Sequence, residues 1–284
     1  MQVDDATEPG QPGSSPGPRV PRDLPDFLTL PARSAKPRNV GLTHVIDRGV
    51  PLETARAVID SCGDEIDFWK FGWGTSYVST NLTAKLALLA RAGIGACLGG
   101  TLMEIAWAQG KVDALLGWAQ ELGLPHVEVS RGTVSMGVDD KHALIARAAT
   151  RFRVISEVGI KDPSQQLSAE QWRPEILGDL QAGATYVVAE GRESGTVGIY
   201  DGAGRVREEV VDVIVDACGP DQVIFEGPRK DQQAWFVRRF GPDVNIGNVA
   251  LEDVVPLQTL RLGLRSDTIG LSVRPMPAPL GERS

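Results

Sequence analysis

The chain has 284 residues, of which 42% are hydrophobic and 23% charged, and its formal net charge is -8. This acidic balance gives no general field that would attract nucleic acid or an anionic membrane, so an anionic ligand must be held by local clusters of basic residues. Cys62, Cys97 and Cys218 are odd in number and widely spaced, which argues against a disulfide framework or a zinc site and predicts reduced thiols in a cytoplasmic protein.

Proline is frequent at both ends of the chain. Residues 1–35 contain seven prolines and little apolar periodicity, so they predict a disordered leader. Residues 273–284 carry three more prolines and predict a loose tail. No run approaches the roughly 18 apolar residues of a membrane helix, and the first residues lack the basic and apolar regions of a signal peptide. The sequence therefore predicts one folded domain over residues 36–272 and no membrane association.

Short β-rich runs alternate with longer amphipathic runs along this domain. The short runs predict eight strands, at residues 40–47, 66–71, 94–98, 126–130, 153–157, 185–190, 222–226 and 244–246. The longer runs predict helices at residues 52–61, 82–92, 115–122, 141–149, 174–182, 206–217, 231–240 and 251–263. Because parallel strands need helical crossovers, eight such units predict an α/β fold of the (β/α)8 TIM barrel type. An open doubly wound sheet is the alternative, although no G-x-G-x-x-G follows the first strand.

Three successive predicted strands, the fifth to the seventh, each finish in a glutamate, namely Glu157, Glu190 and Glu226. Barrel chemistry lies at the carboxyl ends of the strands, and neighbouring strands are about 5 Å apart, so these carboxylates are expected to face one small volume. They repel one another unless a cation lies among them, and oxygen ligands without His or Cys favour Mg2+. The alternative is that they pair with nearby basic residues and hold the barrel mouth together.

Basic and amide side chains follow several of the same strands and form a candidate anion-binding set. Its members are Lys70, Arg131, Lys161, Arg192, Lys230, Asn245, Asn248 and Arg265. The last loops of a barrel commonly bind phosphate, and arginine offers a planar fork to an oxyanion. Arginines that follow a last helix also often simply cap it.

Histidine and aromatic residues give weaker signals. Only His44 of the three histidines lies near a predicted strand end, so a histidine-based nucleophile system has little support. Trp69 is predicted to pack in the core. For Trp73 the sequence allows two interpretations, packing in the core or stacking on a ligand.

Several long strings resemble those of the phosphosulfolactate synthase family, over about residues 41–270. They include "GLTHVIDRGVPL", "CGDEIDFWKFGWGTS", "SEVGIKDP", "AEGRESGTVGIYD" and "FEGPRKDQQAWFVRRFGPDVNIGNV". The resemblance implies a (β/α)8 barrel that uses Mg2+ to add sulfite to phosphoenolpyruvate, giving (2R)-phospho-3-sulfolactate. Such an enzyme is a carbon-sulfur lyase of coenzyme M biosynthesis, and a symmetric homo-oligomer, such as a trimer, is expected.

The resemblance also implies roles for residues. Lys161 lies at the family's catalytic lysine position and is expected to donate the proton to C2 of the substrate. Glu157, Glu190 and Glu226 are expected to hold the Mg2+. Lys70, Arg192, Lys230 and Arg265 are expected to counter the charges of phosphate and sulfite.

The chain departs from the family pattern at two positions. Ile160 stands where the family typically has a second lysine, and Arg131 stands where it typically has an acidic residue. These changes leave open an alternative function: a relative whose pocket adds another nucleophile to an enol phosphate, or a non-catalytic, stress-associated binding protein.

Overall fold

The computed structural model describes residues 25–273, which contain a closed parallel β-barrel. Its strands pair in chain order, and β8 closes on β1. The strands are β1 (Thr43–Asp47), β2 (Phe68–Phe71), β3 (Gly95–Leu98), β4 (His126–Val129), β5 (Arg153–Val158), β6 (Ala184–Ala189), β7 (Val223–Glu226) and β8 (Ile246–Val249). The predicted (β/α)8 barrel is confirmed.

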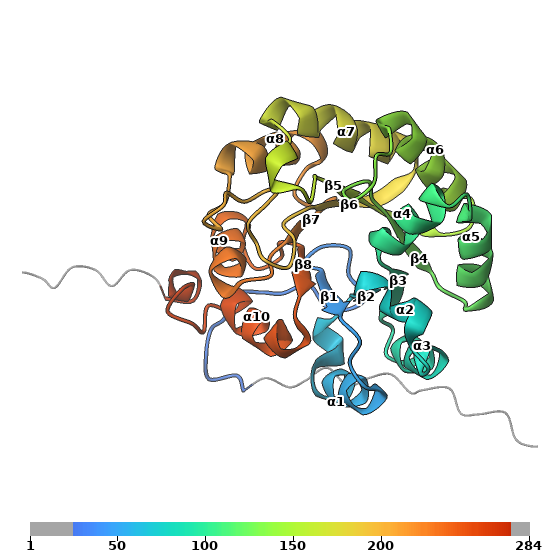
Figure 1. Ribbon diagram of the computed structural model, residues 1–284. Coiled ribbons are helices and arrows are strands. Elements are labelled where there is room, and N and C mark those ends of the chain that lie inside the picture. The colour runs from blue at the N-terminus through green and yellow to red at the C-terminus, as the bar shows by residue number, and fades with distance from the viewer. Residues whose placement is uncertain (1–24, 274–284) are drawn as a thin grey trace, which may run out of the picture.

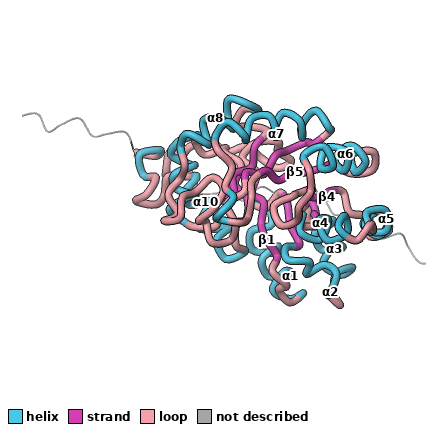
Figure 2. Tube along the Cα trace, turned by 45° about the horizontal axis from the view of Figure 1, so that its top comes forward, coloured by secondary structure: helices cyan, strands magenta, loops and turns pink. Residues whose placement is uncertain are grey.

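Ten α-helices join the strands within the described residues and form a ring outside the barrel (Figure 1). They are α1 (Leu52–Cys62), α2 (Thr75–Val78), α3 (Leu82–Arg91), α4 (Gly100–Ala108), α5 (Val112–Glu121), α6 (Val138–Ala149), α7 (Ala169–Ala182), α8 (Glu208–Cys218), α9 (Lys230–Phe240) and α10 (Val254–Arg261). Figure 2 shows the strands enclosed by this helical layer. None of these helices is both long and apolar enough to cross a bilayer.

Successive side chains of each strand point to opposite faces of the barrel wall, and both faces are packed, so the strands are buried. One set points outward against the helices and forms the larger core, with members such as Val127, Val154 and Val187. The other set points into the barrel, where Leu42, Phe68, Cys97, Ile155, Val188 and Ile224 fill the interior. This apolar layer fills the barrel interior next to the polar carboxyl ends of the strands and is called the apolar floor below.

The last strand and one helix differ from the sequence predictions. The eighth strand was expected at residues 244–246, but β8 spans Ile246–Val249, so its carboxyl end comes three residues later. Helix α4, which begins at Gly100, two residues after the end of β3, was not predicted. Its high mean apolarity hides the 3.6-residue period, because few of its positions are polar.

At the amino ends of β1 and β8, Arg33 and Arg261 bind the backbone that precedes both strands, and these two arginines are here called the clasp. Arg33 donates to the backbone oxygens of Gly41 and Pro242 and pairs with Asp243 at 2.5 Å. Arg261, fully buried, donates to the backbone oxygens of Leu42, Pro242 and Val244. The predicted leader, residues 1–35, therefore extends too far, since residue 33 already belongs to the packed domain. The remaining leader up to residue 24 and the predicted tail from residue 274 lie outside the described residues.

Candidate active site

A polar layer lies directly above the apolar floor at the carboxyl end of the barrel. In β2, β5 and β7, the inward position two residues after an apolar floor residue is charged, which places Lys70 above Phe68, Glu157 above Ile155 and Glu226 above Ile224. Glu128 in β4 and Glu190 after β6 complete the layer. All five side chains line one cavity of about 200 Å³. A cavity this small suits a ligand smaller than a typical drug molecule.

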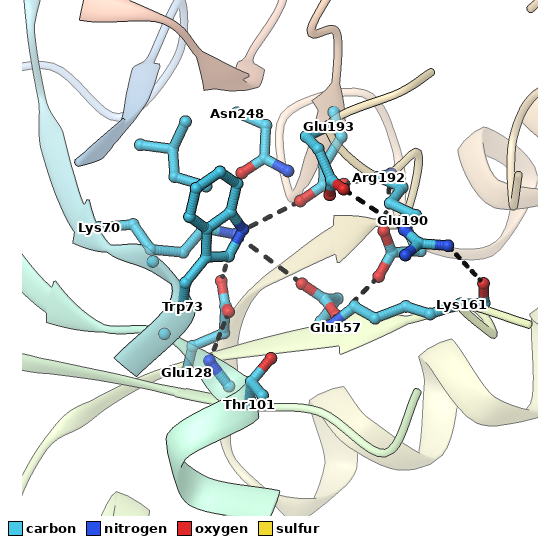
Figure 3. Close-up of a pocket in the computed structure, with 15 residues that line it drawn as sticks. Lys70, Trp73, Thr101, Glu128, Glu157, Lys161, Glu190, Arg192, Glu193 and Asn248 are labelled. Atoms are coloured by element: carbon cyan, nitrogen blue, oxygen red, sulfur yellow. Dashed lines mark hydrogen bonds and ion pairs between the residues drawn. The ribbon is translucent and has the colours of Figure 1, made fainter. Parts of the chain in front are cut away.

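Lys70 lies at the centre of this layer (Figure 3). Its Nζ is 3.2 Å from Glu128 Oε2, 3.3 Å from Glu226 Oε1 and 3.8 Å from Glu157 Oε2. Burial alone would lower the pKa of Lys70, but attraction to the three carboxylates outweighs it and holds the pKa above its ordinary value. Lys70 therefore remains a cation inside the barrel.

Lys161, on the loop after β5, is the second cation of the cavity. Its Nζ is 2.9 Å from Glu157 Oε1 and 3.6 Å from Glu190 Oε2, and about a quarter of its side chain is exposed, at 24%. Burial lowers its pKa, but Glu157 and Glu190 together raise it well above the ordinary value. Lys161 is thus a charged ammonium at neutral pH that reaches the open side of the cavity.

The carboxyl groups of the cavity differ in their affinity for protons. Burial raises the pKa of Glu128 to about 7, against the opposing pull of Lys70. Burial and the neighbouring Glu157 and Glu226 raise the pKa of Glu190 well above its ordinary value. Burial would also raise the pKa of Glu157, but Lys161 and Lys70 outweigh it and lower that pKa. The cavity therefore contains both ionised and protonated carboxyl groups near neutral pH, which is the arrangement that acid–base chemistry requires.

The raised pKa of Glu128 predicts a pH-dependent contribution to stability. The folded protein binds this proton more tightly than the unfolded chain between pH 4.5, the ordinary value, and about 7, so stability falls as pH rises through that window. Glu128→Gln removes the titration. We expect the free energy of unfolding of the variant, minus that of the parent, to rise by about 3 kcal/mol from pH 4.5 to pH 7.5 in urea denaturation.

Glu175 provides a control of opposite sign for that experiment. Burial opposes its ionisation, but Lys141 and Arg131 outweigh burial and lower its pKa, so it stabilises the folded protein above its unfolded pKa and loses that effect as pH falls. The same difference measured for Glu175→Gln should fall, not rise, with increasing pH. A flat difference for Glu128→Gln would contradict the assignment of a raised pKa.

The donor chemistry of the layer suits a hard divalent cation. Glu128 Oε2, Glu157 Oε1 and Glu190 Oε2 are buried, and each lies within 4 Å of a lysine ammonium group. Glu226 is more fully engaged, since Oε2 accepts from the backbone N–H groups of Gly191 and Arg192 while Oε1 faces Lys70. Among residues 25–273, no three such side chains already surround a common point. A metal ion here would therefore have to displace lysine ammonium groups from carboxylate oxygens.

Seven of the eleven predicted site residues line the cavity: Lys70, Glu157, Lys161, Glu190, Arg192, Glu226 and Asn248. Asn248 is buried and its Oδ1 accepts no hydrogen bond, so it has a free acceptor at the cavity. Arg192 is largely exposed at the mouth, where it lies 3.5 Å from Glu193.

Arg131 does not line the cavity. It forms a bidentate pair with Glu175 of α7, at 2.9 and 2.5 Å, on the outer side of β5. Glu175 also binds Lys141 of α6, a fully buried lysine that donates to Asp179 at 2.7 Å and to the backbone oxygen of Glu157 at 2.8 Å. Arg131 was predicted to bind substrate, but the structure places it in this buried network. The prediction could not anticipate this, because its partner Glu175 lies 44 positions away in the chain.

Three other predicted substrate ligands also lie away from the cavity. Asn245 precedes β8, at the opposite end of the barrel, where its side chain accepts from the backbone N–H of Leu42 and donates to the backbone oxygens of Asp221 and Val223. Lys230 is bound by Asp267 at 3.1 Å, and Arg265 lies 3.9 Å from the same carboxylate. The shift of β8 toward the C-terminus explains the error for Asn245, and pairing with Asp267 explains the other two.

Sequence reasoning missed Glu128 and Thr101, which line the cavity together with Glu193. Glu128 was missed because only the final residue of each strand was considered, whereas it is the third of four in β4. The signal was present, since a buried strand with the pattern His-Val-Glu-Val places a charged residue at an inward position. Thr101 lies in the first turn of α4, the helix that was not predicted.

The remaining sequence interpretations concern His44, Trp69 and the cysteines. His44 lies in the barrel floor against Phe68, fully buried, and burial lowers its pKa well below the ordinary value. Trp69 packs in the core, as predicted, with its indole donating to Asp47 at 3.1 Å. The three cysteines are free thiols; Cys62 and Cys97 are buried, and Cys218 is partly buried. None of these residues lines the cavity.

Comparison with known proteins gives a consistent result. The family model described as (2R)-phospho-3-sulfolactate synthase (ComA) matches residues 31–267. Phosphosulfolactate synthase of Bacillus subtilis is 42% identical over 250 residues, covering 87% of this chain and 99% of that protein. Phosphosulfolactate synthase of Methanocaldococcus jannaschii is 42% identical over 236 residues, covering 81% of this chain and 94% of that protein.

Similarity to solved structures extends to the fold alone. 3-Hexulose-6-phosphate synthase from Salmonella typhimurium superimposes with a TM-score of 0.51 at 12% identity, covering 81% of this chain and 94% of that one. Thiamine phosphate pyrophosphorylase from Pyrococcus furiosus gives a TM-score of 0.50 at 13% identity, covering 82% and 97%.

Proposed function

This chain belongs to the (2R)-phospho-3-sulfolactate synthase family, and we propose that it catalyses the Mg2+-dependent addition of sulfite to phosphoenolpyruvate. The product is (2R)-phospho-3-sulfolactate, and the reaction type is that of a carbon-sulfur lyase acting in the bond-forming direction. The observation that carries the proposal is the polar layer together with Lys161, which brings two lysines and four glutamates to one small cavity above an apolar floor. We expect the enzyme to act in the cytoplasm.

The reaction requires charge stabilisation followed by one proton transfer. The lone pair of the sulfite sulfur forms a bond to C3 of phosphoenolpyruvate, and the electrons of the C2–C3 double bond move into the carboxylate to give an aci-anion. A proton then moves to C2 and the double bond of the carboxylate is restored. A fixed cation near the carboxylate lowers the barrier for the first step, because it interacts more strongly with the anionic intermediate than with the substrate.

Lys161 is the proton donor in this proposal. Its ammonium is held at the cavity by Glu157 and Glu190, and its raised pKa keeps it protonated until the anion forms. After the transfer Lys161 recovers a proton from solvent, which reaches its partly exposed side chain. Lys70, buried beneath the cavity and charged, is placed to counter the anionic substrate throughout.

Mg2+ is part of the proposal, and Glu157, Glu190 and Glu226 are the residues that we expect to hold it. Glu157 and Glu190 line the cavity with buried oxygens that would bind the ion in place of lysine ammonium groups, and Glu128 is an additional candidate for the same reason. When bound, the metal ion would supply positive charge that stabilises the anionic intermediate.

Two positions at which the chain departs from the family pattern do not alter the cavity. Arg131 points outward to Glu175, and neither Arg131 nor Ile160 is among the residues that line the cavity. The polar layer therefore contains neither of the two departures. This supports the sulfite-adding reaction over a pocket adapted to another nucleophile or a non-catalytic role.

Product analysis tests the proposal directly. We expect purified protein incubated with phosphoenolpyruvate, sulfite and Mg2+ to form phosphosulfolactate, detected by mass spectrometry, and excess EDTA to abolish its formation. Formation in EDTA would contradict the metal requirement. Absence of product from a folded protein that still binds phosphoenolpyruvate would contradict the choice of sulfite as the nucleophile.

A further inference from the structure

Three residues other than glycine have a left-handed backbone conformation in the described part of the chain. They are Trp73 with φ 54°, Arg192 with φ 60° and Asn248 with φ 51°. All three line the same cavity, although they follow β2, follow β6 and lie within β8. Strained backbone conformations persist where the surrounding structure enforces them, and they concentrate at ligand-binding sites.

Trp73 is the least expected of the three. Asparagine adopts this conformation with little penalty, whereas a bulky side chain does so rarely. Trp73 lies between Gly72, where an added Cβ would come within 2.8 Å of Ile46, and Gly74, which is itself left-handed with φ 68°. The turn after β2 therefore has glycine on both sides of the strained position, but tryptophan at that position.

The indole of Trp73 is not explained by core packing. Trp73 is 57% exposed, while Trp69, four residues earlier, is fully buried. Outside the cavity, the guanidinium of Arg48 lies 5.7 Å from the Trp73 ring centroid, and Arg48 in turn lies 3.9 Å from Glu252. The ring thus lies at the mouth of the cavity, and its contact with Arg48 connects it to the loops after β1 and β8.

We propose that Trp73 is the specificity-determining roof of the site, and that its indole covers the methylene end of a phosphoenol substrate. The inference rests on the proposed function for the identity of that substrate. Figure 3 draws Trp73 among the cavity-lining residues, together with Lys70 and Asn248. An aromatic roof over so small a cavity admits an unsubstituted methylene carbon and rejects one that carries an additional alkyl group.

The roof also bears on the proton transfer. A carbanion-like intermediate open to bulk water would be protonated without facial control, whereas a covered one receives its proton from a fixed group. Lys161 is the fixed donor of the cavity, so the roof and the donor together determine the configuration at C2.

Trp73→Asn tests the proposal because asparagine tolerates the left-handed backbone but lacks the ring. We expect its melting temperature to match or exceed the parent's, by up to about 2–4 °C, as backbone strain is relieved. We expect kcat/KM for phosphoenolpyruvate to fall about tenfold, which corresponds to the loss of a half-buried aromatic contact. The preference for phosphoenolpyruvate over its 3-methyl analogue should fall by about tenfold or more.

Two further variants complete the test. Trp73→Phe keeps an aromatic ring on the strained backbone and should recover part of the lost preference. Tyr77→Ala removes an exposed aromatic side chain of α2 that does not line this cavity, and should leave the preference unchanged. An unchanged preference in Trp73→Asn overturns the proposal, and so does a fall in activity that only accompanies a lower melting temperature.

Failure of the proposed function gives a different result. If the parent binds phosphoenolpyruvate in calorimetry but forms no product with sulfite, the reaction is wrong, and the roof is judged from the dissociation constants of phosphoenolpyruvate and its methyl analogue in parent and variant. If the parent does not bind phosphoenolpyruvate, both proposals are overturned.

Discussion

Replacing Lys161 with alanine is expected to reduce turnover by at least about a hundredfold, the usual scale for removal of a proton donor. Lys161 is the one cavity lysine with an exposed side, and its ammonium is held by Glu157 and Glu190 at 2.9 and 3.6 Å. Binding of phosphoenolpyruvate, measured by calorimetry, should remain largely intact because Lys70 still counters the charge of the substrate.

Lys161→Arg separates the charge of this residue from its proton. Arginine keeps the positive charge beside Glu157 and Glu190 but does not release a proton at accessible pH. We therefore expect this variant to bind phosphoenolpyruvate like the parent and to remain as slow as Lys161→Ala. A near-normal rate in the alanine variant would contradict the role as donor, and a near-normal rate in the arginine variant alone would show that charge is sufficient.

Replacing Lys141 with methionine is expected to lower the free energy of unfolding by about 3–5 kcal/mol, because it leaves the buried carboxylate of Asp179 without its lysine partner. Lys141 is fully buried and binds Glu175 at 2.9 Å and Asp179 at 2.7 Å. It also donates to the backbone oxygen of Glu157, so the variant loosens the strand that carries a cavity carboxylate. Urea denaturation at pH 7.5 measures the change, provided that the m-value is unchanged.

A double variant shows whether charge is the cause. Lys141→Met with Asp179→Leu removes the uncompensated carboxylate as well as the lysine, and an apolar pair commonly replaces a buried ion pair without large cost. We expect it to recover part of the lost stability, while Glu175 keeps its bidentate partner Arg131. A single variant within about 1 kcal/mol of the parent would contradict the account.

The barrel and the three strand-end glutamates could be predicted because they depend on local patterns. Alternating short and long runs give the strand–helix order, and a charged residue at the end of a buried run marks the carboxyl edge of the barrel. The position of Glu128 depends instead on which face of β4 it occupies, and that was not considered.

The predicted site residues that lie away from the cavity are those that bind partners distant in the chain. Arg131 is next to a strand end in sequence, yet Glu175 on α7 draws it outward. Asn245 lies within the strand predicted at residues 244–246, yet pairing with β1 and β7 starts β8 at Ile246 and leaves Asn245 at the amino end. Tertiary packing determines which of several possible partners such a side chain binds. A short stretch of sequence carries no information about that packing.

The closure of the barrel at β1 and β8 has a consequence for the order of folding. Every other strand pairs with its neighbour in the chain, whereas this junction joins Thr43 to Ile246. Closing a loop of about 200 residues rather than about 25 costs about 2 kcal/mol more in chain entropy, so this junction is expected to form late. The clasp of Arg33 and Arg261 therefore stabilises the contact that has the largest entropic barrier. Partial unfolding would accordingly begin at the junction, on the far side of the barrel from β4 and β5, the strands that carry Glu128 and Glu157.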